Sequence, residues 1–113
     1  MARRTSTEDQ ADATGIIAGY LAYQNWIKFH SEEGRLPSLG KYTPNQLFWI
    51  SYGRFWCALE SDDYIKHFLT RLRHSRYMYR VQIPLMNSEE FSKDFKCPSG
   101  SKMNPVKKCK IWN

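Results

Sequence analysis

Two carboxylates near the start of the chain have the spacing that places them on one face of a helix. Glu8 and Asp12 are four residues apart, so their Cβ atoms would lie about 6 Å apart on successive turns. Such a pair is either a solvated acidic helix start or a metal ligand with a second carboxylate behind it. The second interpretation needs histidines, and the chain has only His30, His67 and His74. No two of them have the four-residue spacing of a helical zinc site.

A second group of reactive side chains lies between residues 71 and 80. Its members are Arg71, Arg73, His74, Arg76, Tyr77, Tyr79 and Arg80. Guanidinium groups bind phosphates and tyrosines stack on bases, so these residue types alone leave a nucleic-acid surface open. No nucleic-acid-binding motif accompanies the cluster. The other interpretation is an ordinary helix end, where the helix dipole favours a histidine in the last turn.

The composition predicts one small domain with a hydrophobic core. The chain has 113 residues, of which 42% are hydrophobic and 15% aromatic, which excludes disorder throughout. The net charge of +6 comes entirely from residues 61–113, where eleven basic residues meet five acidic ones. The longest apolar run, residues 16–23, is only eight residues long, far short of the ~20 that span a bilayer. We therefore expect no membrane span in this chain.

The elements that must position these residues are mainly helices. Apolar residues at helical spacing predict a first helix that starts near Thr7 and ends near His30. Thr43 followed by proline and, three residues on, by glutamine predicts a capped second helix. The apolar residues that follow indicate that this helix is buried on most sides. Capping signals at Ser61 and Ser88 predict a third helix, to about Arg73, and a short fourth one.

One segment has a different period. Tyr77, Tyr79, Val81 and Ile83 alternate with less apolar residues, and alternation is typical of an extended strand. The fold prediction is therefore mainly α, with one short extended segment near residues 77–83. Residues 31–41 and the lysine-rich tail from Cys97 onward are expected to be loops.

Six separate stretches, in order, resemble one protein family. They are Glu8 to Gly15, Ala18 to Tyr23, Arg35 to Leu39, Asn45 to Cys57, His74 to Val81, and Phe95 to Trp112. These are similar to the E-N-x-A-D-x-G-G, A-Y-x-A-Y, R-L-P-G-L, N-Q-L-F-F plus W-C, H-S-P-G-x-x-R-V and C-terminal motifs of the neprilysin and endothelin-converting-enzyme family of zinc metallopeptidases. The resemblance implies that residues 1–113 form a single unit, the C-terminal helical portion of a zincin-type catalytic domain.

The resemblance also implies a role for each reactive residue. Glu8 matches a zinc ligand, and Asp12 matches the carboxylate that orients a zinc-binding histidine and assists proton transfer. His74 matches the residue that stabilises the oxyanion of the tetrahedral intermediate. Arg80 matches the residue that binds a backbone carbonyl of the substrate. These roles imply zinc as cofactor and small peptides, rather than nucleic acid, as partners.

Two departures from the family pattern limit what the chain does alone. The HExxH motif, which carries the two zinc-binding histidines and the glutamate that activates water, is absent from these residues. The missing upstream part of the peptidase is therefore an expected partner. Arg76-Tyr77 also stands where the family has Pro-Gly.

The family implies an extracellular location and disulfide bonds from Cys57, Cys97 and Cys109 to upstream cysteines. Because these three residues are the only cysteines in the chain, at least one is free or pairs elsewhere. We also expect little except disulfides to hold the loop-rich tail.

Two functions from different classes remain at this point. The first is a portion of a zinc endopeptidase that hydrolyses small peptides in its full-length form. The alternative is a truncated, non-catalytic protein that keeps the helical scaffold and binds peptides or a partner.

Overall fold

The computed structural model describes residues 2–111, which contain five α-helices and one short 3-10 helix. In chain order these are α1 (Ala2–His30), η1 (Pro37–Leu39), α2 (Pro44–Phe55), α3 (Asp62–Arg71), α4 (Tyr77–Asn87) and α5 (Glu89–Asp94). The predicted mainly α fold is thus confirmed. Trp112, the last residue of the family-like stretches, lies outside the described residues.

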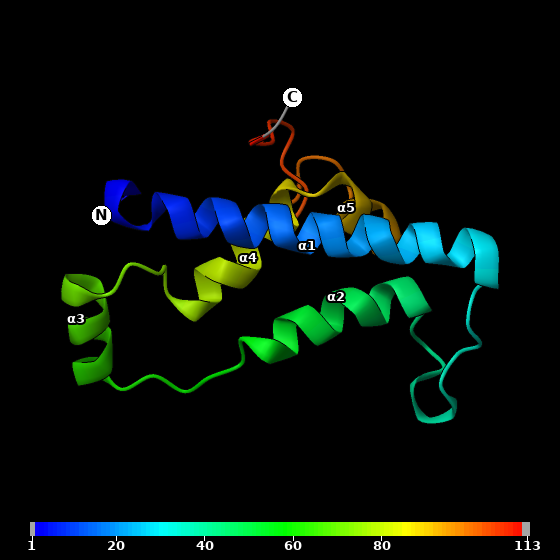
Figure 1. The fold of residues 1–113 in the computed structure, drawn as a ribbon, viewed down its shortest axis with the longest axis horizontal. Helices are drawn as coiled ribbons and strands as arrows, with labels where there is room; N and C mark the ends of the chain where they lie inside the picture. Colours follow the sequence, from blue (N-terminus) through cyan, green and yellow to red (C-terminus); the bar gives the residue numbers. More distant parts are fainter. Residues whose placement is uncertain (1, 112–113) are drawn as a thin grey trace.

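Helix α1 runs along the longest dimension of the molecule, and α3 stands across its direction near its N-terminal end (Figure 1). Its 29 residues span about 43 Å. The helix begins at Ala2, earlier than the predicted start near Thr7. The guanidinium of Arg4 donates hydrogen bonds to the carbonyls of Leu69 and Thr70 at the end of α3. This long-range contact pairs carbonyls that the end of a helix leaves free. Because it joins residues far apart in the sequence, the local pattern around Arg4 could not predict it.

A small aromatic core joins α1 to α2, α4 and α5. Ile16, Tyr20, Trp49 and Leu85 are its buried members. The ring of Tyr20 stacks on Trp49 with 4.6 Å between centroids, and Phe91 meets Trp49 edge-on at 5.9 Å. Stacked and edge-on arrangements of this kind are the favourable ones for aromatic pairs. The helices are therefore held by a few large rings.

Three of the helix starts are capped as predicted. Thr43 and Gln46 form a reciprocal capping box at the start of α2. The hydroxyls of Ser61 and Ser88 accept the backbone N–H of Tyr64 and Phe91 at the starts of α3 and α5. Each such cap pairs a backbone donor that the helix itself leaves free.

The predicted extended segment near residues 77–83 is wrong, because residues 77–87 form α4. Val81 and Leu85, four residues apart, pack against the core, whereas Tyr79 and Ile83 are about half exposed. The core-facing period is therefore helical. Within residues 77–83, Val81 faces the core while Tyr79 and Ile83 are exposed. Because all three are apolar, their alternation in the sequence had the period of a strand.

The prediction that the second helix is buried on most sides is also wrong. Within α2 only Trp49 is fully buried, while Ile50 is partly exposed and Phe55 is 77% exposed. Leu59 and Phe29 are large apolar residues that face solvent as well. The accessible surface is 8400 Å², against roughly 6500 Å² expected for a protein of this mass. The chain thus exposes more surface than is usual for its mass, and several large apolar residues contribute to it.

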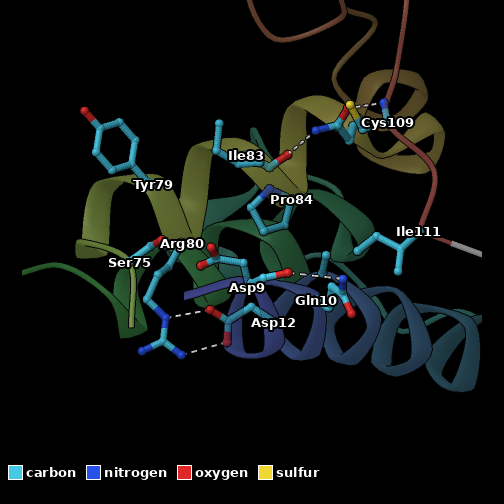
Figure 2. A pocket seen from close by; sticks show the side chains of 13 residues that line it. Asp9, Gln10, Asp12, Ser75, Tyr79, Arg80, Ile83, Pro84, Cys109 and Ile111 are labelled. Carbon is cyan, nitrogen blue, oxygen red and sulfur yellow. Dashed lines mark hydrogen bonds and ion pairs between the residues drawn. The ribbon is translucent and has the colours of Figure 1, made fainter. Parts of the chain in front are cut away.

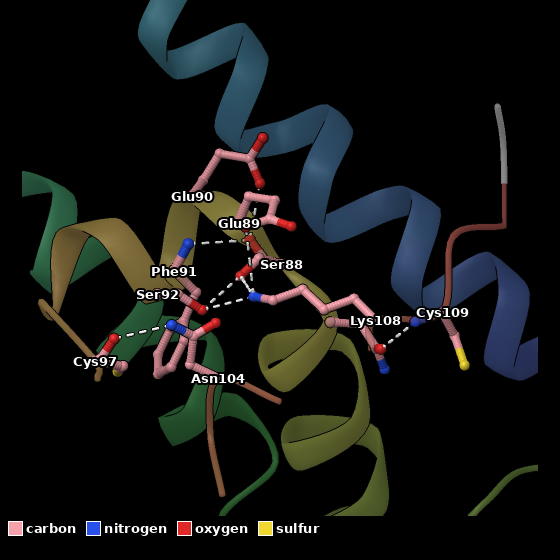
Figure 3. A network of polar contacts seen from close by, with 10 residues as sticks. Ser88, Glu89, Glu90, Phe91, Ser92, Cys97, Asn104, Lys108 and Cys109 are labelled. Carbon is pink, nitrogen blue, oxygen red and sulfur yellow. Dashed lines mark hydrogen bonds and ion pairs between the residues drawn. The ribbon is translucent and has the colours of Figure 1, made fainter. Parts of the chain in front are cut away.

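Hydrogen bonds hold the tail, contrary to the expectation that little except disulfides would do so (Figure 3). The ammonium of Lys108, only 6% exposed, donates to the carbonyl of Ser88 at 2.9 Å and to the hydroxyl of Ser92 at 2.7 Å. The amide of Asn104 donates to the carbonyl of Cys97 at 2.8 Å. The buried lysine attaches the tail to the junction between α4 and α5.

We predict that Tyr20→Phe weakens the fold and changes its alkaline pH dependence. The Tyr20 hydroxyl donates to the Asp94 carboxylate at 2.8 Å, and hydrogen bonds to charged groups contribute about 1.5–3 kcal/mol. Burial, and then that hydrogen bond, raise the pKa of Tyr20 above its ordinary range. The folded state therefore keeps a proton that the unfolded chain loses near pH ~10, so this stabilisation is present below that pH and is lost above it.

Urea unfolding at pH 7 and at alkaline pH checks the prediction. Tyr20→Phe should be less stable at pH 7, and its free energy of unfolding should fall less steeply at alkaline pH. Tyr42→Phe is the matched control, because its hydroxyl lacks a hydrogen-bond partner among the described residues. Equal stability of the two variants would contradict the role given to Tyr20.

We predict that two of the three thiols react quickly. Cys57 and Cys109 are exposed and Cys97 is half-buried, and all three are free. Thiol counting with a disulfide reagent should give two fast groups and one slow group in the native chain, and oxidation should produce mixed or intermolecular disulfides on non-reducing electrophoresis. Three unreactive thiols and a clean monomer after oxidation would contradict this.

Candidate active site

A buried ion pair joins the first half of α1 to α4 (Figure 2). Arg80 Nε donates to Asp12 Oδ2 at 2.5 Å and Arg80 Nη2 donates to Asp12 Oδ1 at 2.7 Å. The two side chains are only 11% and 14% exposed. The hydrogen bond to Asp12 raises the pKa of Arg80 further above its ordinary value. Bidentate pairs of this kind fix orientation as well as distance.

A second acidic and basic pair lies one helical turn away. Glu8 Oε2 is 3.5 Å from His74 Nδ1, and the side chains of both residues are about 40% exposed. His74 Nδ1 makes no hydrogen bond within the described part of the chain. The Glu8 side chain is therefore partly accessible, whereas His74 Nδ1 is buried beside it without a hydrogen bond among the described residues.

The fold brings together all four residues that the sequence singles out. Glu8 and Asp12 come from one face of α1, His74 from the loop before α4, and Arg80 from the first turn and a half of α4. Arg80 still has N–H groups that Asp12 does not use, since a guanidinium carries five. The arrangement places two carboxylates, one imidazole and one guanidinium at the junction of α1 and the segment that leads into α4.

Tyr52 of α2 and Trp56, the residue after that helix, contact Arg80, and the sequence analysis did not assign them to the site. The guanidinium of Arg80 lies 3.8 Å from the centre of the Trp56 ring, and the hydroxyl of Tyr52 donates to the backbone carbonyl of Arg80 at 2.7 Å. The four-residue spacing of Tyr52 and Trp56 places them on one helix side. That spacing was a usable signal, but it does not reveal which residue the two rings contact.

The unusual Arg76-Tyr77 pair is accommodated by contacts of its own. Arg76 donates from Nε and Nη2 to Glu60 Oε2, at 3.2 and 2.9 Å, and the Glu60 side chain is only 9% exposed. The Tyr77 ring stacks on Trp56 with 6.0 Å between centroids. The loop that carries His74 is thereby fixed without the Pro-Gly sequence of the family pattern.

The same contacts bear on whether the basic cluster of residues 71–80 could bind nucleic acid. Arg76 and Arg80 are paired with carboxylates of this chain, whereas Arg71 and Arg73 are exposed. The charges of two of the four guanidinium groups are thus balanced by carboxylates of this chain, which lowers their capacity to neutralise phosphates.

A cavity of about 340 Å³ lies beside the Asp12–Arg80 pair (Figure 2). Asp9 and Gln10 of α1 line one side, and Tyr79, Ile83 and Pro84 of α4 line the other. Its size is at the lower end of the range for small-ligand sites. A side chain of a bound peptide has the dimensions for such a cavity.

The donor set for a metal is incomplete within residues 2–111. No group of three or more His, Cys, Asp or Glu residues in this range could hold a metal ion. Glu8, accessible and adjacent to His74, fits one position of a zinc site, but tetrahedral zinc takes four ligands. Among the same residues, no helix is both long and apolar enough to cross a membrane.

Comparisons with known proteins agree with the sequence motifs. The profile of peptidase family M13 matches residues 2–111. Neprilysin-2 of Drosophila melanogaster is 44% identical over 108 residues, which are 96% of this chain and 14% of that protein. Endothelin-converting enzyme 1 of Mus musculus is 44% identical over 110 residues, which are 97% of this chain and 14% of the enzyme.

A solved structure has the same fold. It is titled Haemonchus galactose containing glycoprotein complex, and it superposes with a TM-score of 0.90 at 44% identity, covering 96% of this chain and 19% of that chain. This chain spans about a seventh of the length of the two curated relatives, neprilysin-2 and endothelin-converting enzyme 1. The match nevertheless extends over nearly every residue of this chain and includes the helices that carry Glu8, Asp12 and Arg80. The chain belongs to peptidase family M13.

Proposed function

We propose that this chain is the C-terminal part of a zinc endopeptidase and that it contributes one zinc ligand and the peptide-binding wall of the active site. The observation that carries the proposal is the convergence of Glu8, Asp12, His74 and Arg80 at the junction of α1 and α4. The chemistry that a zinc ion would supply in such a site is a more acidic bound water, and Glu8 is the residue of this chain that would help to hold the ion.

Each residue has a role that its surroundings allow. Glu8 would hold the metal with one carboxylate oxygen, because its side chain is partly exposed. Asp12 would orient a zinc-binding histidine while still paired with Arg80, since each carboxylate oxygen accepts more than one hydrogen bond. His74 would donate a hydrogen bond to the oxyanion, and the unused N–H groups of Arg80 would bind a substrate carbonyl.

The proposed partner is the remainder of the peptidase, which would carry the HExxH motif. The uncovered apolar residues, among them Phe29, Phe55 and Leu59, are the surface that such a partner would bury. The relatives have about seven times the length of this chain, which is ample polypeptide for that purpose. By the same resemblance the complete protein would act outside the cell.

A non-catalytic binding protein is the second candidate. It is favoured by one observation, that the described residues contain no complete metal site. A chain of this kind would bind a peptide through Arg80 and the adjacent cavity without hydrolysing it.

We predict that the isolated chain binds zinc no more tightly than micromolar. The reason is that Glu8 and His74 supply at most two donors of the four that a tight site needs. Competition with a chromophoric zinc chelator at pH 7 measures the affinity. Stoichiometric binding in the nanomolar range would show that the ligand set is wrong.

A graft tests the catalytic proposal. We would replace the matching segment of mouse endothelin-converting enzyme 1 with residues 2–111 and expect hydrolysis of a peptide substrate. Glu8→Ala should abolish both zinc content and activity. Arg80→Ala should leave zinc bound and raise KM about 10- to 100-fold, because a hydrogen bond to a charged group contributes about 1.5–3 kcal/mol.

Arg73→Ala is the matched control, since Arg73 is exposed and has no ion pair among the described residues. A thermal melt of each graft separates loss of folding from loss of binding. Unchanged KM in a folded Arg80→Ala graft would remove Arg80 from the binding site. A folded graft that binds peptide without hydrolysing it would favour the second candidate.

A further inference from the structure

The backbone carbonyl of Arg80 lacks its usual helical partner. In an α-helix this carbonyl accepts a hydrogen bond from the N–H four residues on, and that residue here is Pro84, which lies inside α4 and is buried. Proline has no N–H to donate, and its ring crowds the carbonyl four residues before it. Left unpaired and away from water, a carbonyl of this kind costs free energy.

Tyr52 of α2 supplies the missing donor. Its hydroxyl donates to the carbonyl oxygen of Arg80 at 2.7 Å, which is the common distance for a hydroxyl donor. The neighbouring backbone is also close, because a Cβ atom on Gly53 would lie 3.9 Å from a methyl group of Val81. Helices α2 and α4 are therefore in contact at this point, and the hydroxyl substitutes for an amide across a helix interface.

Arg80 is thus held at both ends by different elements. Asp12 of α1 holds the guanidinium through two hydrogen bonds, the Trp56 ring covers its face, and Tyr52 holds its backbone. A side chain restrained in this way loses little conformational entropy when it binds a ligand.

We propose that Tyr52 is a positioning residue for Arg80, and that its hydroxyl compensates for the amide that Pro84 lacks. The proposal rests on the proposed function in so far as Arg80 binds a substrate carbonyl. Tyr52→Phe removes only the oxygen and keeps the ring, which packs against the core. Loss of the hydroxyl should therefore change the position or mobility of Arg80 and leave the rest of the fold unchanged.

A double-mutant cycle in the 113-residue chain tests the compensation. In Tyr52→Phe the Nε–H resonance of Arg80 should shift, and its exchange with solvent should accelerate roughly tenfold. In the Pro84→Ala background residue 84 regains an N–H for the Arg80 carbonyl, so adding Tyr52→Phe should have little further effect. This rescue is the result that a merely structural tyrosine would not give.

Two internal references keep the test decisive. The indole N–H of Trp49, which donates to Asp94 at 2.7 Å, reports the core in the same spectrum and should not move. Tyr42→Phe is the matched variant, because Tyr42 lies outside the cavity lining and its hydroxyl has no hydrogen-bond partner among the described residues. An unshifted Arg80 resonance in Tyr52→Phe, or an equal shift in both backgrounds, would overturn the proposal.

The same variants in the graft connect positioning to binding. Tyr52→Phe should raise KM by a factor on the order of three to ten, with a smaller change in kcat. Because Pro84 itself lines the cavity, the comparison is made within the Pro84→Ala background, where adding Tyr52→Phe should leave KM nearly unchanged. Arg80→Ala could leave KM of the graft unchanged while the Arg80 Nε–H resonance shifts in Tyr52→Phe only when Pro84 is present. In that case the proposed function is wrong, and the role of the Tyr52 hydroxyl in replacing the missing amide is supported. If Arg80→Ala raises KM and the resonance cycle fails, the proposed function stands and the role of Tyr52 is wrong.

Discussion

The carboxylate of Asp94 is the contact on which the arrangement of the helices depends. Its Oδ2 accepts from Tyr20 of α1 at 2.8 Å and from the indole of Trp49 of α2 at 2.7 Å, and its Oδ1 accepts from Asn45 at 3.3 Å. Fully paired polar groups of this kind specify one geometry, whereas apolar contacts alone tolerate several. Because Asp94 is the last residue of α5, one side chain sets the positions of three helices.

The candidate site lies at the other end of α1 from this contact. Glu8 and Asp12 are two to three turns before Tyr20 on the same continuous helix, so the rigidity of α1 carries the alignment from the core to the site. Arg80 then joins α4 to Asp12, which is 68 positions away in the sequence. Together with the contact of Arg4 at the end of α3, these polar contacts in the core and in the site hold a long helix that has few buried apolar residues of its own.

The sequence allowed prediction of those features whose cause is local. The caps at Thr43, Ser61 and Ser88 depend on neighbours within three residues, and all three are present. Helix α4 was missed because its core-facing residues, Val81 and Leu85, show a helical period only when the window extends beyond Pro84. The four site residues could be selected by resemblance, but their pairing into Asp12–Arg80 and Glu8–His74 depends on how α1 and α4 pack. No local pattern contains that information.

The distance in sequence between Tyr20 and Asp94 has a consequence for how the protein is made. The two residues are 74 positions apart, and at about 5–20 residues per second a ribosome needs roughly 4 to 15 s to add that length. During this interval α1 has already been synthesised, while the carboxylate that orients it does not yet exist. Ile16 and Tyr20, buried in the finished fold, are then open to other polypeptides. We therefore expect the core-facing side of α1 to stay incompletely covered on the nascent chain until α5 has been synthesised.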